Sequence, residues 1–193
     1  MPGLGNQPLR ADAQTLYMAD LSKDLDGWSG GAQWHGQERG VISSEDNPAA
    51  PSNPFVPHLL APYRPSEANI QVDAQIKVVG YGFRDETIFG ILVGSDRQGM
   101  GYGCGLNWGR EIQLWPEDSA KGLTGFTTGN AGADFSDYVT LTVTIRNKVM
   151  TLFIAGQMAA QATAPGYQAG GFVGLYAANG AVEVRSFRVE KLV

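Results

Sequence analysis

Strict alternation of apolar and polar residues is the strongest structural signal in the sequence. Residues 70–78 and 138–146 show it, with apolar positions at Ile70, Val72, Ala74, Ile76, Val78, Val139, Leu141, Val143 and Ile145. A period of two places these side chains on one face of a β-strand and the intervening polar side chains on the other. In residues 138–146 both faces carry β-branched residues, which oppose a helix. These stretches predict half-buried strands.

Other segments extend the β pattern. Residues 87–94 are apolar on both faces, which predicts a central strand covered on both sides. Asn147-Lys148 and Asn179-Gly180 each separate two strand-like runs, and Asn-Gly is a strong hairpin signal. The apolar positions change parity near Arg185 and Ser186, which predicts a β-bulge there.

Composition agrees with this interpretation. The chain has 193 residues, with 26 glycines, 10 prolines and 17% charged residues, which suits strands and turns better than a helical bundle. Six prolines fall in residues 46–66, for which we expect an extended surface connection with a short edge strand at His58 to Ala61. We predict a flexible segment at residues 1–14 and one domain at residues 15–193, all-β and with no helix of any length.

Charge and cysteine content exclude several classes of partner. A net charge of -5 without a run of Lys or Arg argues against nucleic acid and against an anionic membrane. No stretch of about 18 apolar residues is present, so we expect a soluble chain with no membrane insertion. Cys104 is the only cysteine, so no internal disulfide can form; we expect it to face the core and to be inert.

The stretch from Gly99 to Trp115 places glycine at every second position before a polar turn. A three-residue loop at residues 107–109 would pair Leu106 with Arg110. The apolar face would then hold Tyr102, Cys104, Leu106, Ile112 and Leu114, and Gly103 and Gly101 would lie across from Gln113 and Trp115. On the glycine-rich strand itself the other face would then carry no side chains, and we call this bare surface the floor.

Two interpretations of this floor remain open. Trp115 or a facing sheet could pack closely on the glycines, which is the usual role of glycine in strands and the one we favour. Alternatively, the floor is a shallow groove in which Trp108, Glu111, Gln113 and Trp115 bind a sugar through an aromatic ring and polar groups.

Several weaker motifs have simpler explanations. Residues 27–31 match the nucleophile elbow G-x-S-x-G, but no strand–helix context surrounds Ser29, so we expect a turn there. His35 and His58 are far apart and lack the spacing of a metal site. Arg84 and Asp85 lie in a charged loop at residues 83–86 that could bind calcium or a sugar, although a solvated turn is the simpler interpretation. We therefore expect no cofactor, with calcium as the open alternative.

The order and spacing of these segments resemble the concanavalin A-like lectin/glucanase superfamily. The resemblance covers most of the chain, including residues 16–28, 61–80, 88–106, 138–162 and 170–192. It is closest to the laminin-G-like and DUF1080 (keto-disaccharide-hydrolase-like) branch, which also occurs as a bacterial extracellular module. It implies a two-sheet antiparallel jelly-roll β-sandwich, lectin-like, on a secreted or cell-surface bacterial protein.

The sequence departs from that branch where catalysis is concerned. Tyr102 is followed by Gly103 and Cys104, whereas the hydrolase-like relatives carry an acidic residue after Gly-Tyr, and the E-x-D-x-x-E glucanase signature is absent. No family catalytic residue can be carried over, and the two carboxylates of glycoside hydrolysis cannot be identified.

Three functions therefore remain. A non-catalytic module that binds an oligosaccharide or a glycan surface ranks first. A structural module that binds protein or associates with itself ranks second, because Thr140, Thr142 and Thr144 form a ladder that suits strand addition. An enzyme acting on glycosides or keto-sugars, with Asp73, Asp85 or Glu111 as its acids, ranks third.

Overall fold

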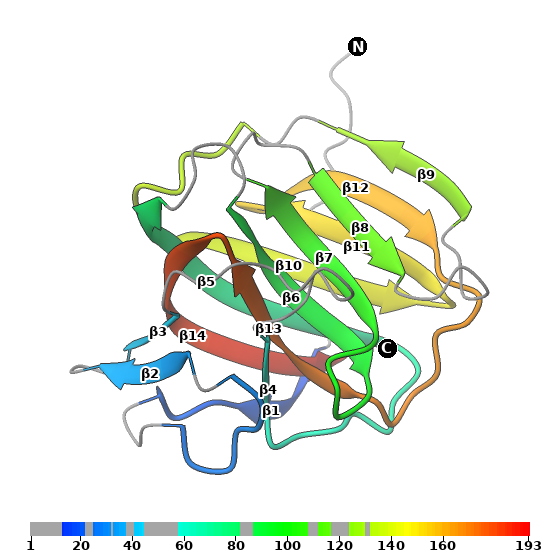
Figure 1. The fold of residues 1–193 in the computed structure, drawn as a ribbon. Helices are drawn as coiled ribbons and strands as arrows, with labels where there is room; N and C mark the ends of the chain where they lie inside the picture. Colours follow the sequence, from blue (N-terminus) through cyan, green and yellow to red (C-terminus); the bar gives the residue numbers. More distant parts are fainter. Residues whose placement is uncertain are drawn as a thin grey trace.

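Two antiparallel sheets stacked face to face make up the protein (Figure 1). The computed structural model describes residues 13–21, 25–31, 33–37, 41–44, 58–81, 87–107, 112–116, 124–129 and 132–193. No α-helix occurs among them. The prediction of an all-β jelly-roll sandwich is confirmed.

The large sheet runs in the order β2-β3-β14-β5-β10-β11-β12-β9, with β1 also paired to β14. Its strands are β1 (Gln14–Met18), β2 (Trp34–Gln37), β3 (Val41–Ser44), β5 (Ile70–Tyr81), β9 (Thr124–Thr128), β10 (Val139–Arg146), β11 (Val149–Ile154), β12 (Gln157–Thr163) and β14 (Gly180–Lys191). Every pairing between these strands is antiparallel.

The small sheet runs in the order β4-β13-β6-β7-β8 and crosses in front of the large sheet in Figure 1. Its strands are β4 (His58–Leu60), β6 (Ile88–Ser95), β7 (Tyr102–Asn107), β8 (Ile112–Pro116) and β13 (Phe172–Ala178). β6 lies in the middle and is buried along most of its length, so the predicted central strand is confirmed. β4 is an edge strand as predicted, although its three residues are buried rather than on the surface.

The core fills the space between the sheets. It contains the inward-facing side chains of the central strands of both sheets, including Val72, Ile76, Leu141, Val143, Leu152, Val184, Phe187, Phe89, Ile91, Cys104, Leu106 and Leu175. Removing these apolar side chains from water is the main driving force for the stacking of the two sheets. Because the inward positions are apolar, the alternating polar residues of β5 and β10 lie on the outer face of the large sheet.

The predicted bulge lies in β14, opposite β5. Val184 pairs with Ile76 and Ser186 pairs with Gln75, so Arg185 is the extra residue. Phe187 then returns to the core, whereas Arg185 and Ser186 both line the outer surface of the sheet. The bulge therefore adds one side chain to that outer surface.

Candidate functional site

The hairpin that the sequence singled out as a sugar site is described only in part. Trp108, Glu111, Arg84 and Asp85 lie outside the described residues. Gln113 and Trp115 belong to β8, where their backbones pair with Gly105 and Gly103.

The structure corrects the predicted register of this hairpin by two residues. Leu106 pairs with Ile112 rather than with Arg110, so the connection is longer than the three residues that we expected. A shift of two preserves which residues share a face. Tyr102, Cys104 and Leu106 are buried in the core, and Ile112 and Leu114 pack against it, as predicted.

The glycines of β7 face the outer side of the small sheet, where Tyr176 of β13 occupies part of the floor. Tyr176 is 1% exposed, and its hydroxyl oxygen would lie 2.7 Å from a Cβ atom built on Gly90 and 2.6 Å from one built on Gly105. A Cβ on Gly105 would also collide with the carbonyl oxygen of Phe89. Close packing thus explains Gly90 and Gly105, and the ring that covers them is a tyrosine.

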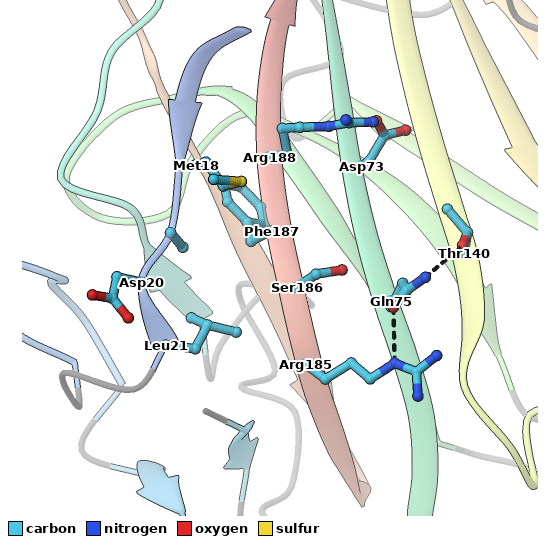
Figure 2. A pocket seen from close by; sticks show the side chains of 11 residues that line it. Met18, Asp20, Leu21, Asp73, Gln75, Thr140, Arg185, Ser186, Phe187 and Arg188 are labelled. Carbon is cyan, nitrogen blue, oxygen red and sulfur yellow. Dashed lines mark hydrogen bonds and ion pairs between the residues drawn. The ribbon is translucent and has the colours of Figure 1, made fainter. Parts of the chain in front are cut away.

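A more open candidate site lies on the outer face of the large sheet. It is a depression of about 570 Å³ over β14, β5 and β10, bounded on one side by residues 18–21 at the end of β1 (Figure 2). Its polar lining consists of Asp20, Asp73, Gln75, Thr140, Arg185, Ser186 and Arg188. Antiparallel pairing of β5 with both β10 and β14 brings all of these except Asp20 together from three distant segments, and Asp20 comes from the segment after β1.

Asp73 is the centre of a hydrogen-bond network in the floor of this depression. Its carboxylate accepts hydrogen bonds from the Thr142 hydroxyl (2.5 Å), the Gln71 side-chain amide (3.0 and 3.2 Å) and Nη2 of Arg188 (2.8 Å). Its side chain is 12% exposed, so these donors replace most of the water that the carboxylate loses.

Arg188 connects Asp73 to a second carboxylate. Its Nη1 lies 3.2 Å from Oε1 of Glu190, whose side chain is 8% exposed. The hydrogen bond to Asp73 raises the pKa of the Arg188 guanidinium, which stays positively charged. Both carboxylates are therefore held in ion pairs, an arrangement that stabilises the sheet surface.

Arg185 is held differently. Its Nε donates a 2.8 Å hydrogen bond to Oε1 of Gln75, and the amide of Gln75 in turn lies 3.4 Å from the Thr140 hydroxyl (Figure 2). The guanidinium carbon lies 4.3 Å from the ring centroid of Tyr138, which is within cation–π distance. The exposed Arg185 side chain is thus oriented by two contacts and still open to solvent.

Tyr138 links this arginine to a neighbouring ion pair. Its hydroxyl donates a 3.0 Å hydrogen bond to Glu183, which lies 3.9 Å from Nζ of Lys77. Burial, followed by the interactions with Glu183, raises the pKa of Tyr138 to about 12.

The sequence suggested Asp73 only as a possible acid of an enzyme and did not indicate this site. The threonines that suggested strand addition lie on β10, which is internal in the large sheet, and Thr142 is engaged by Asp73. These threonines therefore do not form a free edge to which a strand could be added. The usable signal was the run of alternating polar residues on β5 opposite the charged positions of β14.

Metal and nucleophile sites have no support in the described part of the chain. No group of three or more His, Cys, Asp or Glu side chains is placed to hold a metal ion there. Ser29 makes a single β-bridge with Leu60 and is followed by no described helix, so a nucleophile elbow is not formed.

Comparison with known proteins gives matches in structure only. No protein-family profile matches the sequence, and no curated protein matches it. Among the described residues no helix has the length and apolar character needed to cross a membrane.

Among solved structures, the GH43 protein BlXynB from Bacillus licheniformis superposes with a TM-score of 0.67 at 13% identity, over 91% of this chain and 39% of that one. Carbohydrate-binding module CBM66 from Bacillus subtilis gives 0.60 at 12% identity, over 86% of this chain and 96% of the module. A xylan β-1,4-xylosidase from Bacillus halodurans superposes with a TM-score of 0.56 at 12% identity, over 96% of this chain and 41% of the xylosidase. The chain thus has the length of the binding module and less than half that of the two larger proteins, and it shares its sandwich fold with all three.

Proposed function

We propose that this protein is a non-catalytic carbohydrate-binding module and that the depression on the outer face of the large sheet is its binding site. The observation that carries the proposal is the combination of a solvent-open depression of about 570 Å³ with a hydrogen-bonded polar floor. The fold shared with CBM66 supports the same class of ligand.

The chemistry of the lining suits a sugar. Gln75, Thr140 and Ser186 offer both donors and acceptors, as the hydroxyl groups of a sugar do. Met18 and Leu21 supply an apolar wall for the C–H faces of a ring. The volume falls in the range of small-molecule sites, which spans roughly 300–1,000 Å³.

The arrangement favours binding over hydrolysis. Glycoside hydrolysis requires one carboxyl group as a proton donor and a second as a nucleophile or base. Asp73 and Glu190 are the close pair of carboxylates in this region, and both are engaged by Arg188. An enzyme acting on glycosides would have to use other acids.

The origin of the module is part of the proposal. Within the concanavalin A-like sandwiches we assign the chain to the laminin-G-like and DUF1080 branch, on the pattern of residues 138–156 and 171–189. Because the structural neighbours include bacterial carbohydrate-active proteins, we place the module on a secreted or cell-surface bacterial protein.

The glycine-rich hairpin remains the competing location for a sugar. There the ligand would contact Trp108, Glu111, Gln113 and Trp115, and Arg84 and Asp85 of the charged segment at residues 83–86 would bind calcium or sugar. The packing of Tyr176 on Gly90 and Gly105 is why we place the site on the large sheet instead.

A glycan array probed with the labelled protein, with and without calcium, tests the function. We expect saturable binding to at least one glycan and no turnover of that glycan on long incubation. A blank array would contradict a carbohydrate-binding function, and release of product would make the protein an enzyme.

Two variants then locate the site by calorimetric titration with the bound glycan. Gln75→Ala removes the group that orients Arg185 and should weaken binding about tenfold, whereas Trp115→Ala should leave it unchanged. The reverse result would place the site on the hairpin. Thermal unfolding of both variants confirms that each retains its fold.

A further inference from the structure

Arg185 differs from its charged neighbours in how its charge is balanced. Arg188 faces two carboxylates, Asp73 and Glu190, and Lys77 lies 3.9 Å from Glu183. No carboxylate of the described residues lies within ion-pair distance of Arg185. Among the described residues, Arg185 thus lines the depression without a direct ion pair, and Glu183 is the carboxylate connected to it, through Tyr138.

The orientation of Arg185 is fixed even so. Its Nε donates to Gln75 and its guanidinium carbon lies 4.3 Å from the ring centroid of Tyr138. The two terminal nitrogens are not used by the Gln75 hydrogen bond, and they end a side chain that lines the depression and extends over β5 (Figure 2). Asp20, the remaining acid of the lining, comes from the segment after β1 and is drawn well apart from this guanidinium. Two parallel N–H donors on a planar cation match the two oxygens of a carboxylate.

We propose that the depression binds a carboxylate-bearing sugar, a uronate unit, with its carboxylate on Nη1 and Nη2 of Arg185. This inference rests on the proposed carbohydrate-binding function and adds the class of sugar. The ring hydroxyls of the uronate would contact Gln75, Thr140 and Ser186, which line the same depression.

The β-bulge gives a structural reason for this placement. Arg185 is the inserted residue of β14, and without the insertion Arg185 and Ser186 could not both face outward over Gln75. The bulge therefore positions a cation above a floor whose other charges are paired within the protein.

Calorimetric titration with matched pairs of glycans tests the inference. The probes are oligogalacturonate, oligomannuronate and oligoglucuronate, each beside its methyl ester, which keeps the shape and removes the charge. Free galacturonate and a sulfated neutral oligosaccharide complete the set. We expect at least one acid to bind at least tenfold more tightly than its ester, and to weaken as salt rises.

The outcomes separate this inference from the proposed function. If esters or neutral glycans bind as well as the acids, the uronate assignment is wrong and the module binds neutral sugars. Equal binding of the sulfated glycan would make the site a general anion site and would also overturn the assignment. Binding to no glycan at all would overturn both proposals. Free galacturonate that binds as tightly as the oligomer would show that one sugar unit fills the site. Weaker binding of free galacturonate would show that the depression takes a longer segment of the chain. Both results support a uronate ligand.

Variants of Arg185 supply the second test. Arg185→Gln should reduce affinity for the acid about tenfold without changing affinity for the ester, and Arg185→Lys should recover only part of the loss because lysine lacks the fork. Arg97→Gln removes an equal charge from the exposed turn between β6 and β7 and should bind normally. Equal losses in Arg185→Gln and Arg97→Gln would show a general charge effect and contradict the site.

Discussion

Nη2 of Arg188 donates a 2.8 Å hydrogen bond to Asp73 across 115 residues of sequence. The two residues are direct partners in the pairing of β14 with β5, so the contact exists only when these strands are in register. Thr142 reaches the same carboxylate from β10. The Asp73 carboxylate therefore connects β5, β10 and β14 beneath the candidate site.

The Asp73 network predicts a large effect on stability. Asp73→Ala removes the acceptor for Thr142, Gln71 and Arg188, and we expect the free energy of unfolding to fall by about 1–3 kcal/mol. Urea denaturation measures the change. Asp26→Ala removes the same charge from an exposed turn and should have little effect. Equal midpoints for the two variants would show that the network does not stabilise the fold.

Close packing on the outer face of the small sheet predicts that Gly105 cannot be replaced. Gly105→Ala would bring a Cβ into the carbonyl oxygen of Phe89 and the Tyr176 hydroxyl, and overpacking of this kind costs about 1–3 kcal/mol. Gly156→Ala is the control, because no atom lies within 4 Å of its Cβ position and only its φ of +79° opposes a side chain. A Gly105 variant at least as stable as the Gly156 variant would mean that the glycine floor is open, as a ligand groove would be.

The single thiol should be inaccessible in the folded protein. Cys104 is 0% exposed, its Sγ lies 3.1 Å from the sulfur of Met150, and burial raises the pKa of the thiol. We expect an aromatic disulfide reagent to label Cys104 only after denaturant is added. In the folded protein the reagent cannot reach the sulfur, and the thiol is not ionised to the reactive thiolate. Rapid labelling of the native protein would contradict the packing of β7 against the core.

Tyr138 should ionise later than an exposed tyrosine in an alkaline titration. Its pKa is raised from 10.0 to about 12, chiefly by burial. Because the folded pKa exceeds the unfolded one, the stabilisation is complete below pH 10 and is lost as the pH rises toward 12. Tyr138→Phe should remove one late transition from the tyrosinate absorbance curve, while Tyr167, whose pKa is also raised to about 12, keeps its own. Loss of a transition near pH 10 instead would contradict the partly buried hydrogen bond from Tyr138 to Glu183.

The sequence predicted the fold well where its patterns are local. Alternation in residues 70–78 and 138–146 depends only on neighbouring side chains, and β5 and β10 follow it. The parity change at Arg185 and Ser186 was also local, and the bulge is there. The register of β7 and β8 was missed by two residues because the apolar pattern fixes the face of a strand but not the length of a loop.

The candidate site could not be predicted in the same way. Asp73, Thr140 and Arg185 come from three strands, and no spacing along the chain shows that β5 pairs with both β10 and β14. The alternation of glycines at residues 99–105 is conspicuous in the sequence and suggested a ligand groove on the hairpin, yet Gly105 packs against the Tyr176 hydroxyl and the Phe89 carbonyl oxygen. Alternating polar residues on adjacent strands were the better indicator.

The residues that a bound sugar perturbs decide between the large sheet and the glycine-rich hairpin. We would titrate isotope-labelled protein with the glycan that gives the strongest array signal and follow the backbone amide resonances. We expect the shifts to gather on residues 73–75, 140 and 185–188, around the depression over β5, β10 and β14. Shifts confined to residues 102–116 would place the site on the glycine-rich hairpin and contradict this expectation.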